Sequence, residues 1–272
     1  MSTTVIQVQN LTKSFRKSRT LFQALRSEAE YVKAIDDVTF HIDRGEVLGL
    51  VGESGSGKTT LGRTILRLEE PDSGHIYFEG VDLTAIRDQS SLKSYRKRMQ
   101  MIFQDPFESI NPRMKVKDVV EEPLQVHKIG SKQERIELVK SALDDVRITP
   151  PEDFLDRYPH ELSGGQRQRV AIARTLVLRP SFIVADEPVS MLDVSVRMEL
   201  LNLMLELRDR YNLTYLFITH DLTVARYACD RIAVMRLGKI VESGPALEVI
   251  DNPQHPYTKA LRAAVPIVRR QG

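Results

Sequence analysis

Hydrophobic residues along this chain follow two patterns, which predict two kinds of β-strand. Val47–Val51 and Phe182–Ala185 are apolar without interruption, as is typical of strands buried on both faces of a parallel sheet. Val38, Phe40 and Ile42 alternate with polar residues, which indicates a strand with one exposed face. Strands and helices then alternate, with predicted elements at residues 182–186, 194–211, 214–219, 222–229 and 231–235. This alternation predicts an α/β fold with a parallel sheet.

The middle of the chain has a different pattern. Strand signals disappear between Gln104 and Ser163, and residues 116–127 and 132–146 show helical spacing instead. We predict a helical subdomain over residues 105–175, inserted into one α/β domain that covers residues 1–251. Residues 16–33 interrupt the pattern with a basic cluster, and we interpret them as a surface insertion. Shorter strands are predicted at residues 5–8, 75–78 and 99–103, and a helix at residues 58–68.

Composition narrows the function classes only in part. The net charge of +2 gives no general attraction to nucleic acid or to anionic lipid. The basic run at residues 93–98 is interpreted as a solvated helix face, because a single tyrosine is interleaved to stack a base. No apolar run reaches the roughly 20 residues that span a bilayer. The single cysteine excludes an internal disulfide, which fits a reducing compartment.

A glycine-rich segment follows the buried strand at 47–51 and precedes the predicted helix at 58–68. It has the spacing of a phosphate-binding loop, in which glycines let backbone N–H groups surround a phosphate. Lys58 is predicted to contact the β- and γ-phosphates, Thr59 to hold Mg²⁺ and Thr60 to bind a phosphate oxygen. The alternative is a plain glycine-rich connection, but strand and helix flank the segment as a phosphate loop requires. The residues predicted to bind the nucleotide here are Gly52, Ser54, Gly55, Ser56, Gly57, Lys58, Thr59 and Thr60.

The strand at 182–186 ends in two carboxylates, Asp186 and Glu187. Ligands of such sheets bind beyond the carboxyl ends of the strands, so both carboxylates are expected to face the phosphate site. Neighbouring strand residues point to opposite faces, which predicts different roles for the two side chains. Asp186 is predicted to hold Mg²⁺, through water, and Glu187 to polarise the attacking water.

Leu162–Gln166 has the features of a helix start that can bind an anion. Ser163 stands at an N-cap position and Gln166 follows three residues later, as in a capping box. Gly164 and Gly165 leave the first turn without side chains, so an oxyanion could approach its N–H groups. An ordinary capped helix remains the alternative on physical grounds alone.

Leu162–Gln166, placed between the phosphate loop and the acidic strand, resembles the signature of ATP-binding-cassette (ABC) ATPases. The resemblance covers nearly the whole chain and implies a P-loop NTPase sheet core, an antiparallel β subdomain and the inserted helical subdomain. It also implies that Ser163, Gly164, Gly165 and Gln166 of one subunit cover the γ-phosphate held by another. Two cassettes would then close head to tail around two ATP molecules.

The same resemblance implies roles for four further residues. Gln104 matches the loop that touches Mg²⁺ and senses the membrane partner, and Asp193 matches the loop that crosses the dimer interface. His220 matches the switch histidine on the γ-phosphate. Phe15 lies where the family places an aromatic ring on adenine, with Phe22 and Tyr31 as alternatives because of the insertion. Met191 stands where the family more usually has alanine, so packing at that interface could differ.

Residues 252–272 are similar to the C-terminal extension of ATPases from oligopeptide and dipeptide importers. The resemblance therefore implies an ATP-hydrolysing, Mg²⁺-dependent subunit on the cytoplasmic side of a membrane, with Glu187, His220 and Lys58 as catalytic residues. Its implied partners are a second ATPase subunit, two transmembrane permease subunits and, indirectly, a substrate-binding protein, with no nucleic acid. A heterodimer is expected, with a homodimer as the alternative.

Three other functions remain open from the sequence. Related importers carry nickel or short sugar chains. A soluble ABC ATPase of DNA repair or translation is a second alternative, although those usually show a long coiled-coil insertion or two tandem cassettes. A non-hydrolysing ATP sensor is the third.

Overall fold

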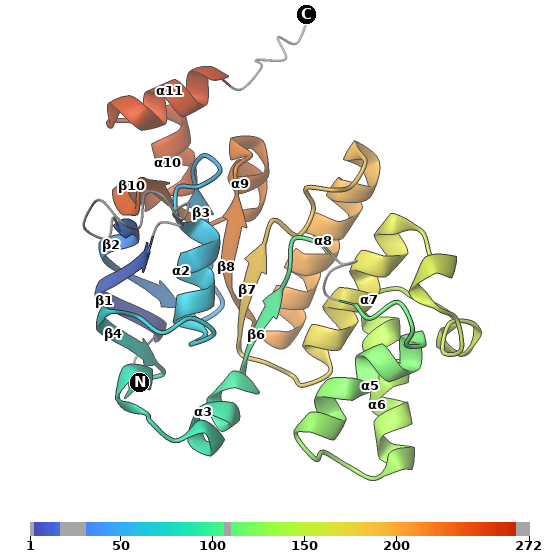
Figure 1. Ribbon diagram of the computed structural model, residues 1–272. Helices are drawn as coiled ribbons and strands as arrows, with labels where there is room; N and C mark the ends of the chain where they lie inside the picture. Colours follow the sequence, from blue (N-terminus) through green and yellow to red (C-terminus); the bar gives the residue numbers. More distant parts are fainter. Residues whose placement is uncertain (1–2, 17–30, 106–109, 265–272) are drawn as a thin grey trace, which may run out of the picture. The chain divides into compact units, whose positions relative to one another are not determined.

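The computed structural model describes residues 3–16, 31–105 and 110–264, which form two compact units. Of these described residues, the first unit contains those up to 89 and those from 217 onward, and the second contains those from 90 to 216. The division falls inside strand β8 (Thr214–Thr219). Figure 1 shows the elements of each unit.

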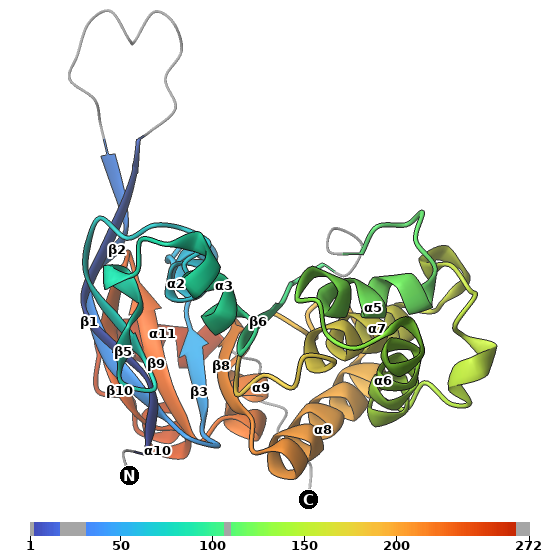
Figure 2. The same ribbon diagram turned by 90° about the horizontal axis from the view of Figure 1, so that it is seen from below.

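An antiparallel sheet of four strands in the first unit has the order β2-β1-β4-β5. Its strands are β1 (Thr4–Arg16), β2 (Tyr31–Asp43), β4 (Ser73–Phe78) and β5 (Val81–Asp82). The long strands β1 and β2 run side by side as a ribbon (Figure 2). Ile6, Val8 and Leu11 are fully buried, so one face of this sheet contributes to the core. The antiparallel β subdomain implied by the family resemblance is confirmed.

A second set of strands in the first unit carries the predicted phosphate loop. β3 (Val47–Val51) pairs in parallel with β9 (Arg231–Arg236), and β9 pairs antiparallel with β10 (Lys239–Pro245). All five residues of β3 are buried, as its unbroken apolar pattern predicted. Among its described residues, the helices are α2 (Lys58–Ile65), α9 (Leu222–Ala228), α10 (Ala246–Asp251) and α11 (Pro256–Ala264), and Leu83–Ala85 forms a 3₁₀ turn.

The second unit combines two parallel strands with a group of helices. β6 (Met99–Ile102) pairs in parallel with β7 (Phe182–Asp186), and all five residues of β7 are buried. α5 (Val116–Val126) and α6 (Lys132–Asp145) contact each other and α7 (Gly164–Leu176), as Figures 1 and 2 show. The structure also describes the helices α3 (Gln89–Arg96) and α8 (Val194–Tyr211) and the 3₁₀ turns Pro151–Asp153 and Pro159–Glu161.

Several predicted elements differ from the observed ones at their ends, and β5, β10, α10 and α11 were not predicted. Residues 16 and 31–33 belong to β1 and β2, so the insertion predicted at 16–33 was drawn too wide; its residues 17–30, including Phe22, lie outside the described part of the chain. α2 ends at Ile65, three residues before the predicted Leu68. The domain boundaries at 105–175, 1–251 and 252–272 stay predictions.

Candidate nucleotide site

The predicted phosphate loop, Gly52–Thr59, connects β3 to α2 in the first unit. Its backbone packs closely against two other segments of that unit. A Cβ on Gly52 would lie 2.2 Å from the carbonyl oxygen of Met235, and one on Gly57 would lie 2.1 Å from that of Ala34. Gly57 also has a φ of +108°, which L side chains rarely adopt. Two glycines of the loop are therefore required by the fold itself, besides any contact with phosphate.

Lys58 begins α2 and turns its ammonium group back under the loop. Nζ donates to the carbonyl oxygens of Gly52 and Glu53, at 2.8 Å each, and lies 3.4 Å from Oγ of Ser56. The lysine is only 5% exposed. A buried cation beside the N-terminus of a helix, within a loop of backbone N–H groups, provides the donor set that binds phosphate oxygens. The loop thus fits a nucleoside triphosphate.

Alanine substitutions at Gly52 and Gly55 should separate packing from backbone conformation. Gly55 has a φ of +79° but no atom within 4 Å of its Cβ position. Gly55→Ala should therefore cost only about 1–2 kcal/mol of left-handed strain. Gly52→Ala places a methyl group against a backbone oxygen and should cost about 3 kcal/mol, at the upper end for overpacking a core. Thermal unfolding would measure both, and equal losses in the two variants would contradict the close packing at Gly52.

Asp186 and Glu187 are separated by the end of strand β7, as predicted. Asp186 is the last strand residue and is 3% exposed. Glu187 leaves the strand with a φ of +45°, a conformation uncommon for residues other than glycine. Its carbonyl oxygen accepts hydrogen bonds from the backbone N–H of Ser190 at 3.2 Å and from Oγ of Ser190 at 3.0 Å. No sequence pattern indicated this role for Ser190.

The structure brings Gln104 and Glu187 together within the second unit. Nε2 of Gln104 donates to Oε2 of Glu187 at 3.2 Å, although 83 residues separate them in the sequence. Gln104 is exposed and follows β6, the parallel neighbour of β7. The carboxyl ends of two paired strands thus present an amide and a carboxylate at one edge, where ligands of α/β sheets bind.

The capping box predicted at Ser163 is present. Oγ of Ser163 accepts from the N–H of Gln166 at 3.2 Å, and Oε1 of Gln166 accepts from the N–H of Ser163 at 2.9 Å. α7 begins at Gly164, as predicted. A Cβ on Gly165 would lie 2.8 Å from Cγ1 of Val196, while one on Gly164 would lie 3.7 Å from Leu192. A Cβ at position 165 would therefore displace Val196 of α8, and glycine also leaves the helix start bare.

The segment that contains Asp193 lies beside this helix start, as those two glycine contacts show. Asp193 is exposed and occupies the N-cap position of α8. Met191 and Val194 next to it are 66% and 74% exposed, and Met198 one turn further is 36% exposed. Three exposed apolar residues thus lie within five positions of Asp193 in the sequence, and Met191 faces solvent here.

His220 follows the last residue of β8 in the first unit, as predicted, and is exposed. The turn that carries it is fixed on both sides. The N–H of Asp221 donates to Oγ1 of Thr219 at 3.0 Å, and the Asp221 carboxylate caps α9 by accepting from the N–H of Thr223 at 2.7 Å. A histidine at this place is presented to solvent by a defined backbone.

The candidates for stacking on adenine lie at the end of the β1–β2 ribbon. Phe15 is 40% exposed and Tyr31 is 62% exposed. Phe15 pairs with Val32, and Tyr31 pairs with Arg16. Residues paired across two strands share a face and successive residues alternate, so Phe15 and Tyr31 point to opposite faces of the ribbon. The two alternatives therefore correspond to different faces. Phe22 lies outside the described residues.

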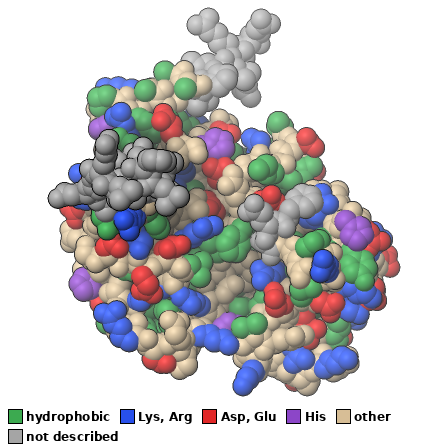
Figure 3. All heavy atoms as spheres, viewed as in Figure 1, with side chains coloured by type: hydrophobic (Ala, Val, Ile, Leu, Met, Phe, Trp, Pro, Cys, Tyr) green, Lys and Arg blue, Asp and Glu red, His purple; other side chains and the backbone are tan. Residues whose placement is uncertain are grey.

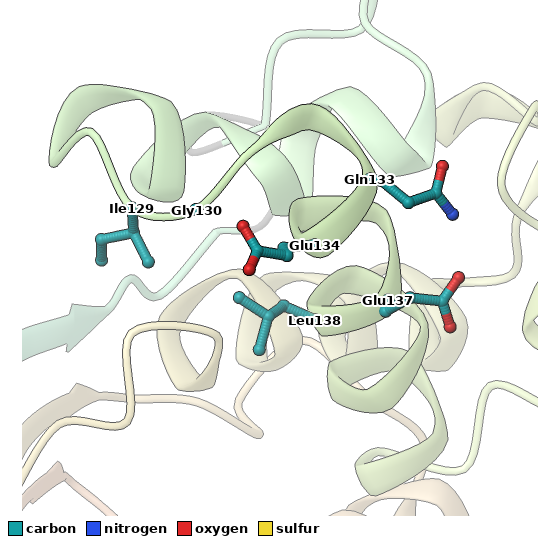
Figure 4. A pocket seen from close by; sticks show the side chains of 6 residues that line it. All are labelled: Ile129, Gly130, Gln133, Glu134, Glu137 and Leu138. Atoms are coloured by element: carbon teal, nitrogen blue, oxygen red, sulfur yellow. The ribbon is translucent and has the colours of Figure 1, made fainter.

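A hollow in the second unit contains none of the residues predicted from the sequence. It measures about 560 Å³ and is lined by Ile129, Gly130, Gln133, Glu134, Glu137 and Leu138 (Figure 4). Ser131 and Glu134 beside it form the capping box of α6. On the face shown in Figure 3, acidic and basic side chains are interspersed, in keeping with the net charge of +2.

Two families match this chain. Residues 35–190 match the ABC transporter family, and residues 241–272 match the C-terminal region of oligopeptide/dipeptide transporters. The chain is 48% identical over 269 residues to the oligopeptide transport ATP-binding protein AppF of Bacillus subtilis, covering 99% of this chain and 80% of that protein. It is 51% identical over 263 residues to OppF of Streptococcus mutans, with 96% and 82% covered.

Solved structures of cassettes resemble this chain in fold. A dimeric structure of MJ0796, a bacterial ABC transporter cassette, has a TM-score of 0.76 at 30% identity and covers 89% of this chain and 98% of that one. A post-hydrolysis MJ0796 dimer bound to ADP and Pi gives the same TM-score at 29% identity, over the same shares of the two chains. The chain belongs to the ABC transporter family, as one of its ATP-binding subunits.

Proposed function

We propose that this chain is the ATP-hydrolysing subunit of an importer for peptides. The hydrogen bond between Gln104 and Glu187 is the observation that carries the proposal, because it joins two motifs that were predicted separately. The C-terminal match at residues 241–272 and the names of the relatives, which are peptide and oligopeptide transport proteins, support peptides as the cargo.

Each polar residue of the site has a role that its chemistry allows. Lys58 and the N–H groups of Gly52–Thr60 would hold the β- and γ-phosphates. Glu187 would orient and polarise the attacking water, since a carboxylate is a suitable general base. His220 would contact the γ-phosphate and lose this contact when the phosphate is released. Phe15 or Tyr31 would stack on the adenine ring.

We propose that oxygen atoms of Thr59, Gln104 and Asp186 hold Mg²⁺, because Mg²⁺ prefers oxygen donors. Among the residues that the structure describes, no three His, Cys, Asp or Glu side chains are grouped as a metal site. Mg²⁺ commonly keeps only one or two protein ligands and takes the others from phosphates and water. Thr59, Gln104 and Asp186 supply hydroxyl, amide and carboxylate oxygens for this purpose. Bound there, Mg²⁺ would neutralise charge on the phosphates.

We propose that two such cassettes close around ATP. The bare start of α7, with Ser163, Gly164, Gly165 and Gln166, would cover the γ-phosphate held by the second subunit. The exposed apolar residues Met191, Val194 and Met198 beside that helix start support a contact surface there, because exposed apolar patches mark interaction sites. A heterodimer with a second ATPase subunit is proposed, with a homodimer as the alternative.

The partners in the membrane would be two permease subunits. In the parts of the chain that the structure describes, no helix is both long and apolar enough to cross a bilayer. We propose that the chain attaches peripherally to the permeases on the cytoplasmic side, near Gln104 and the helices α5 and α6. A substrate-binding protein outside the membrane would deliver the cargo, which this chain would not touch.

Transport by the assembled complex tests the proposal. The chain would be purified from membranes with its partners, identified by mass spectrometry, and the complex placed in proteoliposomes with its binding protein. We expect ATP-driven uptake of oligopeptides that added nickel or oligosaccharides do not reduce. Uptake of nickel or oligosaccharides without peptides would assign that cargo to the importer in place of peptides. A chain found only with nucleic acid or ribosomes, or one that binds ATP without turnover in the complex, would overturn the proposal.

A further inference from the structure

A side chain of α11, in the C-terminal segment 252–264, forms a hydrogen bond with the phosphate loop. The backbone N–H of Glu53, the second residue of the loop, donates to the hydroxyl oxygen of Tyr257 at 3.0 Å. Tyr257 lies in α11, 204 residues later in the sequence, and both residues belong to the first unit. The tyrosine is 7% exposed, so its hydroxyl is delivered to the loop by a packed side chain.

The backbone N–H and the backbone carbonyl oxygen of Glu53 both form hydrogen bonds. Its N–H donates to Tyr257, while its carbonyl oxygen accepts from Nζ of Lys58 at 2.8 Å and from the N–H of Ser56 at 3.2 Å. A shift of this residue would therefore move an acceptor of the Lys58 ammonium group. Tyr257 is thus linked to the proposed phosphate-binding lysine through a single residue.

The position of Tyr257 is fixed by contacts of its own. The guanidinium carbon of Arg236, at the end of β9, lies 4.9 Å from the centre of the tyrosine ring, within the range of a cation–π contact. The N–H of Tyr257 donates to Nδ1 of His255 at 3.2 Å. The turn before α11 is held by Glu242 of β10, whose carboxylate accepts from the N–H groups of Gln254 at 2.7 Å and His255 at 3.1 Å.

The turn between β9 and β10 forms a second hydrogen bond to the phosphate loop. The N–H of Gly238, in the turn between β9 and β10, donates to the carbonyl oxygen of Ser56 at 2.9 Å. A loop whose glycines allow many conformations is thus restricted at Glu53 and at Ser56. Such restriction favours ligand binding because less conformational freedom is lost when the ligand arrives.

We propose that Tyr257 is a positioning residue for the phosphate loop, which makes ATP affinity depend on the C-terminal segment. The inference rests on the proposed function, because it assigns the loop to ATP. Tyr257 acts through Glu53 and touches no reacting atom. Its contribution should appear in nucleotide binding and in the KM for ATP, with kcat nearly unchanged.

Tyr257→Phe tests this inference, because it removes the hydroxyl and keeps the ring. Tyr211→Phe is the matched control. The Tyr211 hydroxyl donates to Asp145 at 2.6 Å within the second unit, whereas Glu53 belongs to the first. Amide hydrogen exchange is measured first, without nucleotide. Exchange at Glu53 should become at least about threefold faster in Tyr257→Phe and stay unchanged in Tyr211→Phe.

Kinetics then connect the contact to the nucleotide. Kd and KM for ATP should rise about three- to tenfold in Tyr257→Phe, as expected for one lost hydrogen bond, with kcat within about twofold of the parent protein. Glu242→Ala, which frees the turn before α11 but leaves the hydroxyl in place, should raise exchange at Glu53 and the KM in the same direction.

Unchanged exchange at Glu53 in Tyr257→Phe would overturn the inference, and so would equal effects in Tyr211→Phe. A fall in kcat with an unchanged KM would also overturn it. The exchange measurement needs no nucleotide, so it still decides the role of Tyr257 if the parent protein neither binds nor hydrolyses ATP. That second result would instead reject the proposed function.

Discussion

Replacing Glu187 with glutamine is expected to abolish ATP turnover while ATP binding persists. The substitution keeps the size of the side chain and removes its charge. Oε1 of the new amide can still accept the hydrogen bond that Nε2 of Gln104 now donates to Glu187, so the local contact should survive. The amide cannot take a proton from water, and loss of a general base typically lowers turnover about 10²- to 10⁴-fold.

Phosphate release measures the turnover of this variant, and equilibrium binding measures its affinity for ATP. Because hydrolysis would reopen the closed dimer, the variant should also accumulate dimers in the presence of ATP and Mg²⁺, detectable by size-exclusion chromatography. Glu137→Gln is a suitable control, since Glu137 is an exposed residue of α6, 61% exposed in its side chain. Turnover of Glu187→Gln equal to that of the parent protein would reject Glu187 as the catalytic carboxylate.

Replacing Lys58 with methionine is expected to remove high-affinity ATP binding. Methionine retains the apolar stem of the lysine, but it cannot donate to phosphate oxygens or to the carbonyl groups of Gly52 and Glu53. Hydrogen bonds to charged groups contribute about 1.5–3 kcal/mol each. Loss of contacts to two phosphates should therefore weaken ATP binding by about 100-fold or more.

Lys93→Met is the matched control for this substitution. Nζ of Lys93 also donates to a backbone carbonyl, that of Val126, at 2.7 Å, but Lys93 is exposed in the second unit and is not a predicted site residue. Isothermal titration with ATP, together with circular dichroism to check folding, would compare the two variants. A folded Lys58→Met protein that binds ATP within about twofold of the parent protein would contradict the proposed role of Lys58.

Elements with a strong, regular apolar pattern were predicted correctly from the sequence. The strands β3, β7 and β8 and the helix α8 have the predicted bounds, because residues buried on both faces, or along a helix face, must be apolar at defined intervals. The strand β10 and the helices α10 and α11 were not predicted. β10 lies at the end of its strand order and is mostly half-exposed, so burial imposes no alternation on its side chains.

The paired ends of β1 and β2 were also not predicted as strand, for the same reason. Residues 16 and 31–33 are paired strand, yet their side chains are exposed and their sequence was interpreted as an insertion. Backbone hydrogen bonds between the two strands hold this part of the ribbon, and such bonds leave no trace in the order of apolar and polar residues.

Short stretches of the chain specify the local chemistry of the site: the glycine-rich loop before α2, the carboxylates at the end of β7, and the capping box of Ser163 with Gln166. These features depend on residues a few positions apart, so their spacing is visible in the chain. Three contacts became known only from the folded chain: Gln104 donates to Glu187, Gly165 packs close to Val196, and Tyr257 accepts from the N–H of Glu53. Those partners come from distant segments, and a side chain's chemistry does not specify which distant group the fold will place beside it.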